Sequence, residues 1–133
     1  MNEEKTSENM RKMISLVNKL RGDGGCPWLK KQDLKKQFNE FKSEVKELEN
    51  AIVNNDINNL REELGDVFWD LLMLIVFSEE EYDFKIENIL DNTSQKIIRR
   101  KPYVFGDEKA ETPEEAIAIW NRIKKEEKLK NLK

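Results

Sequence analysis

Apolar residues recur in steps of three and four along most of this chain, which is the spacing of one face of an α-helix. The clearest case lies between residues 34 and 52, where large apolar side chains form one narrow stripe. Its members are Leu34, Phe38, Phe41, Val45, Leu48 and Ile52. Shorter stretches with helical spacing cover residues 8–21, 60–80 and 83–101, and a last one follows Thr112. The pattern predicts an all-α protein.

Short polar segments separate these stretches. Residues 22–27 read Gly-Asp-Gly-Gly-Cys-Pro and residues 54–59 read Asn-Asn-Asp-Ile-Asn-Asn, so we expect a turn at each. Pro102 ends the helix before it, and residues 103–107 are expected to form a short apolar loop.

The last helix has a clear start signal. Thr112 suits its N-cap, Pro113 its first position and Glu115 a capping box. Its charged tail, from Lys124 onward, is expected to fray. No repeat or linker interrupts the chain, so residues 1–133 are expected to form a single domain, with a four-helix core and an additional C-terminal helix.

The third long helix has an unusually apolar middle. From Val67 to Phe77 every residue is apolar except Asp70. This run is too short to cross a bilayer, which needs about 20 residues, so the helix should be buried on all sides within protein. A four-helix domain of this size leaves one face of such a helix uncovered, which favours a homodimer. The alternative is a monomer whose other helices cover it fully.

The composition narrows the classes of protein to which this chain can belong. Charged and hydrophobic residues each make up 38% of the 133 residues, which suits a folded helical protein rather than a disordered one. The net charge of -3 argues against a partner that is a nucleic-acid polymer, because proteins that bind one are normally basic. The chain has no histidine, which excludes His-based acid–base catalysis and His metal ligands.

The cysteine count and the N-terminus bear on the compartment. Cys26 is the only cysteine, so an internal disulfide cannot form, and a reducing environment fits. The N-terminus is polar and charged, without the pattern of a signal peptide. We therefore expect a cytoplasmic protein that does not associate with a membrane.

Two acidic pairs carry the candidate chemistry. They are Glu44-x-x-Glu47 and Glu63-x-x-Asp66, and residues 48–62 lie between them. Each pair has helical spacing, so its two carboxylates point the same way. Like charges that close repel each other, and a bound Mg²⁺ would relieve this cost because it prefers carboxylate and water oxygens. The pairs therefore predict metal-dependent phosphate chemistry.

Asp70 shares the helix face of the second pair. It lies four residues after Asp66 and seven after Glu63, inside the apolar run. A carboxylate there needs a cation, a hydrogen-bond donor or a proton. It is therefore a candidate fifth metal ligand, and the alternative is an ion pair with a lysine or arginine.

A cluster of cations ends the helix over residues 83–101. Lys96 and Arg100 are one turn apart and could hold phosphate oxygens, with Arg99 beside them. The structural alternative is that these cations only complement the dipole at the C-terminal end of the helix. Spacing alone does not choose between these two readings.

Several stretches together resemble one known family, the MazG-type nucleoside triphosphate pyrophosphohydrolases. In chain order they are Gly25-Cys26-Pro27-Trp28, Glu44-x-x-Glu47, Arg61-Glu62-Glu63-Leu64-Gly65-Asp66, the run from Lys96 to Gly106, and Trp120-Asn121-x-Ile123-Lys124. They cover most of residues 14–128. Each is weak alone, but their combination and order are specific.

The resemblance implies an all-α fold, usually dimeric, that hydrolyses nucleoside triphosphates between the α and β phosphates. It implies Mg²⁺ as the cofactor, and as ligands and catalytic residues the four acids Glu44, Glu47, Glu63 and Asp66. It also implies that Lys96 and Arg100 contact the triphosphate and that Trp120 lies near the nucleotide. Glu47 or Glu63 is a candidate to accept a proton from the attacking water.

The chain departs from the family pattern near Trp28. Residues 29–34 read Leu-Lys-Lys-Gln-Asp-Leu where the family usually has an acidic residue and a Thr-His pair, and Ser43 replaces a frequent Glu. These differences leave the acidic pairs intact but affect a loop of the kind that often sets base selectivity. Trp28 itself is either a core residue or a border of the base pocket.

Two other functions stay open from the sequence. One is a helical dimer without catalysis that serves as a regulatory or interaction module, although such a protein would not need all four acids. The other is a relative of narrow specificity, such as a dUTP or phosphoribosyl-ATP hydrolase.

Overall fold

The computed structural model describes residues 1–131, and within them all regular secondary structure is helical. The helices are α1 (Glu3–Arg21), α2 (Pro27–Lys31), α3 (Leu34–Val53), α4 (Ile57–Glu81), α5 (Ile86–Arg100), α6 (Pro102–Phe105) and α7 (Pro113–Asn131). The all-α prediction is confirmed. The contacts divide the chain into two compact units, Met1–Asp83 and Phe84–Lys133. That the whole chain forms one domain stays a prediction.

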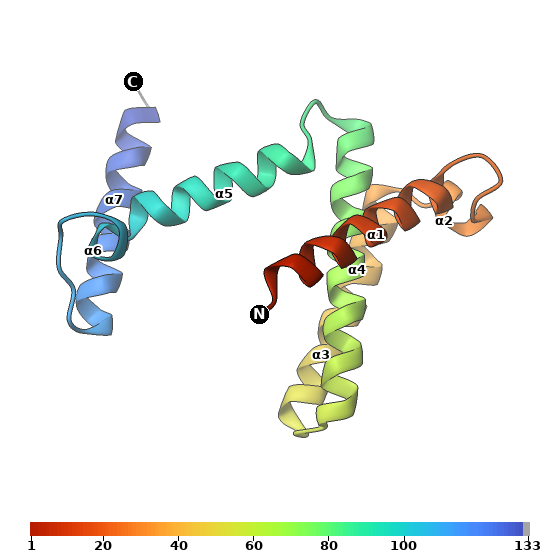
Figure 1. Cartoon of the computed structure of the whole chain (residues 1–133), viewed down its shortest axis with the longest axis horizontal. Coiled ribbons are helices and arrows are strands. Elements are labelled where there is room, and N and C mark those ends of the chain that lie inside the picture. Colours follow the sequence, from red (N-terminus) through yellow and green to blue (C-terminus); the bar gives the residue numbers. More distant parts are fainter. Residues whose placement is uncertain (132–133) are drawn as a thin grey trace. The chain divides into compact units, whose positions relative to one another are not determined.

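The first unit is built on the pair α3 and α4, which lie side by side (Figure 1). The turn between them is short, so the two helices run in opposite directions. Asn55 adopts a left-handed conformation with φ of 52°, which asparagine tolerates better than most residues. Asp56 then caps α4 by accepting a hydrogen bond from the Asn59 amide at 3.2 Å. This hairpin places the middle of α3 opposite the first half of α4.

Arg21 links the last turn of α1 to α2 and α4. Its guanidinium donates hydrogen bonds to the backbone carbonyl of Leu29 in α2 and to the carboxylate of Glu80 in α4. It also lies over the ring of Phe77, 4.5 Å from the ring centroid. The buried apolar residues of this unit are Val17, Leu29, Ala51, Leu72, Met73 and Phe77. Gln37 and Glu63 are the buried polar residues within the described chain.

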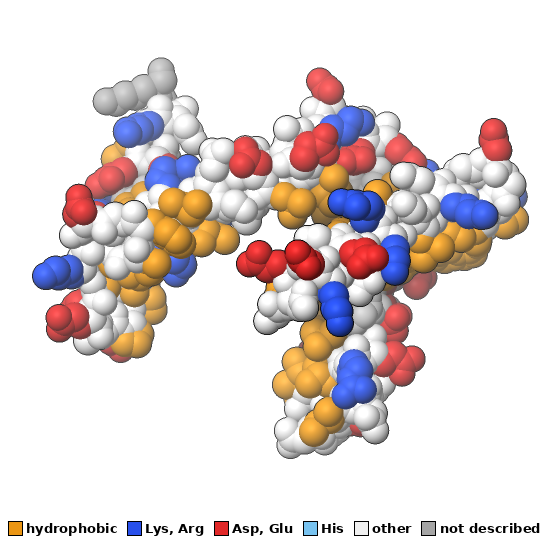
Figure 2. All heavy atoms as spheres, viewed as in Figure 1, with side chains coloured by type: hydrophobic (Ala, Val, Ile, Leu, Met, Phe, Trp, Pro, Cys, Tyr) orange, Lys and Arg blue, Asp and Glu red, His pale blue; other side chains and the backbone are white. Residues whose placement is uncertain are grey.

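The apolar helix α4 is covered on one side only. Leu72, Met73 and Phe77 are buried, whereas Leu64, Phe68 and Leu71 are 52%, 47% and 45% exposed. The expectation of burial on all sides is therefore not met within this chain. Figure 2 shows hydrophobic side chains at the surface of the α3–α4 pair. Among the described residues, no helix has both the length and the apolar character that crossing a membrane requires.

The second unit consists of α5, α6 and α7. α6 follows α5 directly, where the sequence predicted a loop, because Pro102 suits the first position of a helix. The N-cap of α7 is confirmed, since Thr112 Oγ1 accepts a hydrogen bond from the Glu115 amide at 3.2 Å. The Glu115 carboxylate accepts from the Glu111 amide rather than from the amide of Thr112, so the expected capping box is incomplete.

The helices differ from the sequence-based expectation at several points. α4 begins at Ile57 instead of residue 60, and α5 begins at Ile86 instead of residue 83. α1 begins at Glu3 instead of residue 8, because the Asn2 side chain caps it by accepting from the Lys5 amide at 3.0 Å. The short helix α2 was not predicted. α7 continues to Asn131 although its tail was expected to fray, because Glu127 forms ion pairs with α5.

Candidate functional site

Three of the predicted carboxylates meet between α3 and α4. One oxygen of each of Glu44, Glu63 and Asp66 lies within 4.8 Å of the others. Glu63 and Asp66 are close because they are three residues apart on one helix face. Glu44 reaches them because the antiparallel hairpin brings α3 alongside this turn of α4. We call these three residues the carboxylate cluster.

Glu63 is the buried member of the carboxylate cluster. Its side chain is only 8% exposed, and its Oε2 atom has no hydrogen-bond partner among the described residues. A buried polar atom without a partner is costly, and a buried charge is more so. The pKa of Glu63 is raised to about 7, first by a carboxyl–carboxyl hydrogen bond with Glu44, then by burial and by the charges of Glu44, Asp66 and Glu47.

The carboxylate cluster therefore fits a hard divalent cation. It offers oxygen atoms from three acids, close enough to share one ion. The Glu63 carboxyl group also carries the oxygen, Oε2, that lacks a hydrogen-bond partner among residues 1–131. Without a cation, a proton on Glu63 relieves part of the repulsion, as its raised pKa indicates. A Mg²⁺ ion would satisfy the same oxygens with a stronger positive charge.

Two other predicted ligands lie beside the cluster. Glu47 is exposed and is not one of the three grouped acids, although its charge raises the pKa of Glu63. Asp70 is half-buried, and burial raises its pKa. Gln37, 2% exposed, donates its Nε2 hydrogen to the Asp70 backbone carbonyl at 3.3 Å, and its side-chain hydrogen bond lowers the Asp70 pKa. No ion pair of Asp70 is found within residues 1–131, so Gln37 supplies the polar contact there.

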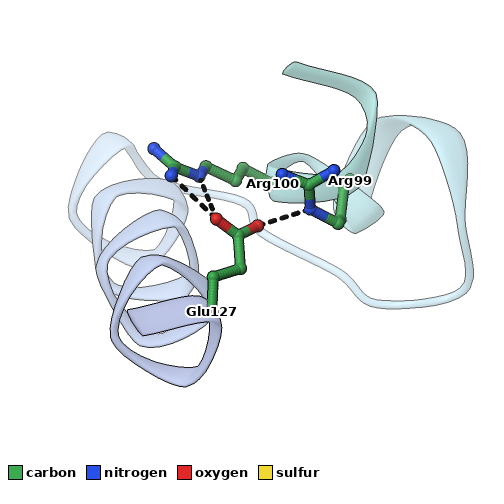
Figure 3. Close-up of polar contacts among 3 residues, drawn as sticks. All are labelled: Arg99, Arg100 and Glu127. Carbon is green, nitrogen blue, oxygen red and sulfur yellow. Dashed lines mark hydrogen bonds and ion pairs between the residues drawn. The ribbon is translucent and has the colours of Figure 1, made fainter. Parts of the chain in front are cut away.

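The predicted phosphate-binding cations lie in the second unit, on α5. Arg100 donates from Nη2 at 2.8 Å and from Nε at 3.2 Å to Oε2 of Glu127 (Figure 3). Arg99 donates from Nε to Oε1 of the same carboxylate. These hydrogen bonds, from Arg99 first and then Arg100, lower the pKa of Glu127 to about 2. Lys96 is half-buried, and the described part of the chain provides it with no ion pair.

Sequence reasoning missed Glu127. The tail that contains Glu127 is highly charged and was expected to fray, so the sequence predicted no partner for the arginines there. A signal was present, since Glu127 follows Trp120 by seven residues and so lies on the same face of α7.

Two cationic side chains lie close to the ring of Trp120. The Arg100 guanidinium carbon lies 5.1 Å from the Trp120 ring centroid, and Lys101 Nζ lies 5.3 Å from it. Lys101 Nζ also donates to the Tyr103 hydroxyl at 3.0 Å. An open groove of about 420 Å³ adjoins these residues, lined by Ile97, Lys101, Tyr103, Ala116, Ile117 and Trp120. Lys101 and Tyr103 were not among the predicted site residues.

Trp28 lies in α2. It is 57% exposed, which excludes the reading of Trp28 as a core residue. A contact of Trp28 with a nucleobase stays a prediction.

Comparisons with known proteins give concordant results. Residues 32–105 match the model of the MazG nucleotide pyrophosphohydrolase domain. The chain is 34% identical over 118 residues to the nucleoside triphosphate pyrophosphohydrolase of Escherichia coli (strain K12), covering 88% of this chain and 45% of that protein. It is 39% identical over 114 residues to the uncharacterized protein YabN of Bacillus subtilis (strain 168), covering 86% of this chain and 23% of that protein.

A solved structure is also similar. The crystal structure of a MazG-related protein from Thermotoga maritima matches with a TM-score of 0.75 and 34% identity, covering 86% of this chain and 98% of that one. By contrast, this chain spans less than half the length of the curated relatives described above.

The carboxylate cluster predicts how the stability of the metal-free protein depends on pH. The folded-state pKa of Glu63 lies above the ordinary value of 4.5. The contribution of Glu63 to the free energy of unfolding is therefore fully present below pH 4.5 and is lost as the pH rises through about 7. The free energy of unfolding should therefore fall between about pH 5 and pH 8. Chemical denaturation at a series of pH values, in the presence of a chelator, measures this free energy.

Glu63→Gln should remove this fall, whereas Glu62→Gln, at an exposed neighbouring position, should leave it in place. A wild-type stability that stays level or rises across the window would contradict the prediction.

Proposed function

Because this chain belongs to the MazG nucleotide pyrophosphohydrolase family, we propose that it hydrolyses nucleoside triphosphates between the α and β phosphates. The products are a nucleoside monophosphate and pyrophosphate. The observation that carries this proposal is that the buried Oε2 atom of Glu63, a member of the carboxylate cluster, has no hydrogen-bond partner in the described part of the chain. Such an atom is explained by a cation, and a divalent cation beside clustered acids suits phosphoanhydride chemistry.

The acids are proposed to hold Mg²⁺. Glu44, Glu63 and Asp66 supply ligand oxygens, and Glu47 is the fourth proposed ligand because its charge already acts on Glu63. Asp70 is the fifth candidate, and its contact with Gln37 keeps it next to this group. The chemistry that Mg²⁺ supplies when bound is neutralisation of phosphate charge and activation of the attacking water.

The residues of the second unit are proposed to bind the nucleotide. Lys96 and Arg100 contact the triphosphate and stabilise the charge that develops on the leaving pyrophosphate, with Arg99 adding positive charge beside them. Trp120 offers an aromatic face next to an apolar groove, which suits contact with a nucleobase. No covalent nucleophile is required, so Cys26 has no role in this scheme.

The chain is further proposed to form a homodimer through the exposed side of α4. Leu64, Phe68 and Leu71 are spaced by four and three residues, so they form one apolar row on this helix. A contiguous apolar row on a surface marks an interaction site more often than chance exposure does. A second copy of the chain would bury this row against the same row on its own α4.

The activity is tested with a panel of ribo- and deoxyribonucleoside triphosphates in the presence of Mg²⁺. We expect release of pyrophosphate and monophosphate from at least one nucleotide, without release of orthophosphate. Turnover of a single nucleotide would indicate an enzyme of narrow specificity. No turnover of any nucleotide would contradict the proposal and favour a binding module.

The ligand assignment is tested by Glu44→Ala and Asp66→Ala. Both variants should lose Mg²⁺-dependent turnover while their circular dichroism spectrum stays helical, because each removes a ligand oxygen without touching the buried core. Glu62→Ala removes an exposed carboxylate from the same helix and should retain activity. Turnover retained by either ligand variant would refute the assignment.

The dimer is tested by sedimentation at micromolar concentration. Wild type should sediment as a dimer, and Phe68→Lys should shift it toward monomer, because a charge in the centre of the apolar row opposes its burial. Glu62→Lys is the matched control on the same helix and should remain dimeric. A wild-type protein that is only monomeric would exclude this interface.

A further inference from the structure

We propose that Glu127 is a positioning residue that fixes Arg100 in the orientation in which it meets phosphate. The proposal rests on the proposed function, because it takes Arg100 as a contact of the triphosphate. Glu127 itself touches no substrate in this account. It acts through the arginine that it holds.

The Arg100 guanidinium contacts two side chains of α7, those of Glu127 and Trp120. Two N–H groups of its guanidinium converge on one oxygen of Glu127, at 2.8 and 3.2 Å. The guanidinium carbon also lies 5.1 Å from the Trp120 ring centroid. The Arg100 side chain is 13% exposed. A guanidinium has five N–H donors, so the contact with Glu127 leaves other donors of Arg100 for an anion.

Glu127 holds two adjacent arginines at once. Its second oxygen accepts from Arg99, whose side chain is 52% exposed. One carboxylate between two guanidinium groups leaves a net positive charge, so the pair still attracts phosphate. Removal of the carboxylate would leave two neighbouring cations that repel each other and a long side chain free to change rotamer.

The benefit of holding Arg100 in this way lies in the entropy of binding. An arginine that is free before binding loses rotamer freedom when it closes on phosphate, whereas an arginine fixed in the folded protein has lost it already. Immobilisation of one long side chain corresponds to an affinity difference of about two- to tenfold. We expect loss of Glu127 to weaken triphosphate binding by this factor.

Two other roles for Glu127 would have different consequences when Glu127 is removed. If Glu127 competed with phosphate for Arg100, its removal would tighten binding. If it served only to join α5 to α7, its removal would lower the thermal stability without a specific effect on the part of binding that depends on Arg100.

The experiment uses the full chain with Glu127→Ala and Glu127→Gln. Glu126→Ala is the matched control, since Glu126 is the neighbouring residue in the chain, its side chain is 60% exposed, and it forms an ion pair of 3.7 Å with Arg122. Two readouts are measured: the KM and kcat for the nucleotide turned over fastest, and the calorimetric affinity for Mg²⁺–tripolyphosphate. Circular dichroism melting verifies that each variant is folded.

We expect Glu127→Ala to raise KM and weaken tripolyphosphate binding by about two- to tenfold, with a smaller change in kcat. Glu127→Gln should have a smaller effect, because its amide oxygen still accepts from Arg100. Glu126→Ala should change neither readout. In an Arg100→Ala background, Glu127→Ala should add no further loss, because the group that it positions is gone.

Unchanged or tighter binding in Glu127→Ala would overturn the proposal, as would an undiminished effect in the Arg100→Ala background. The two proposals fail separately. Turnover with no effect of Glu127 leaves the proposed function standing and removes the positioning role. Absence of turnover, with tripolyphosphate binding that depends on Glu127 only through Arg100, removes the proposed function and leaves the positioning role standing. Failure to bind tripolyphosphate at all removes the positioning role.

Discussion

The arrangement of the first unit depends on one unfavourable interaction, the burial of the Glu63 carboxyl group next to Glu44 and Asp66. An apolar residue at this position would stabilise the helix pair better, because Glu63 is 8% exposed and its Oε2 atom has no hydrogen-bond partner among residues 1–131. The hairpin of α3 and α4 holds the three acids together against their repulsion. A fold that maintains such a cost is explained when a cation occupies the acids.

In the second unit, by contrast, opposite charges are paired. There, one carboxylate is shared by two arginines and its pKa is lowered to about 2, so opposite charges satisfy one another. Glu63 and Glu127 thus have the same chemistry but contrasting surroundings. The pKa of the first is raised by acids and burial, and that of the second is lowered by guanidinium groups. This contrast separates a cluster suited to a metal ion from an ion pair suited to orienting cations.

Much of this could be predicted from local periodicity. The apolar stripe fixed α3 to within a residue of its observed end, and the spacing of Glu63 and Asp66 placed both on one helix face. Periodicity could not reveal α2 and α6, which span only five and four residues. It also could not reveal the pairing of Glu127 with Arg99 and Arg100, because that contact depends on how α7 packs against α5. The burial of Glu63 likewise depends on the hairpin and not on its neighbours in sequence.

A divalent cation that binds the carboxylate cluster, as proposed, should displace a proton from the buried carboxyl group of Glu63. This displacement is tested most directly by calorimetric titration of Mg²⁺ near neutral pH, repeated in buffers of different ionisation enthalpy. Because the pKa of Glu63 is raised to about 7 without metal, Mg²⁺ binding near neutral pH should release protons from the wild-type protein, and Glu63→Gln should abolish this release. Saturable Mg²⁺ binding without proton release, or no binding to the wild-type protein, would contradict the account.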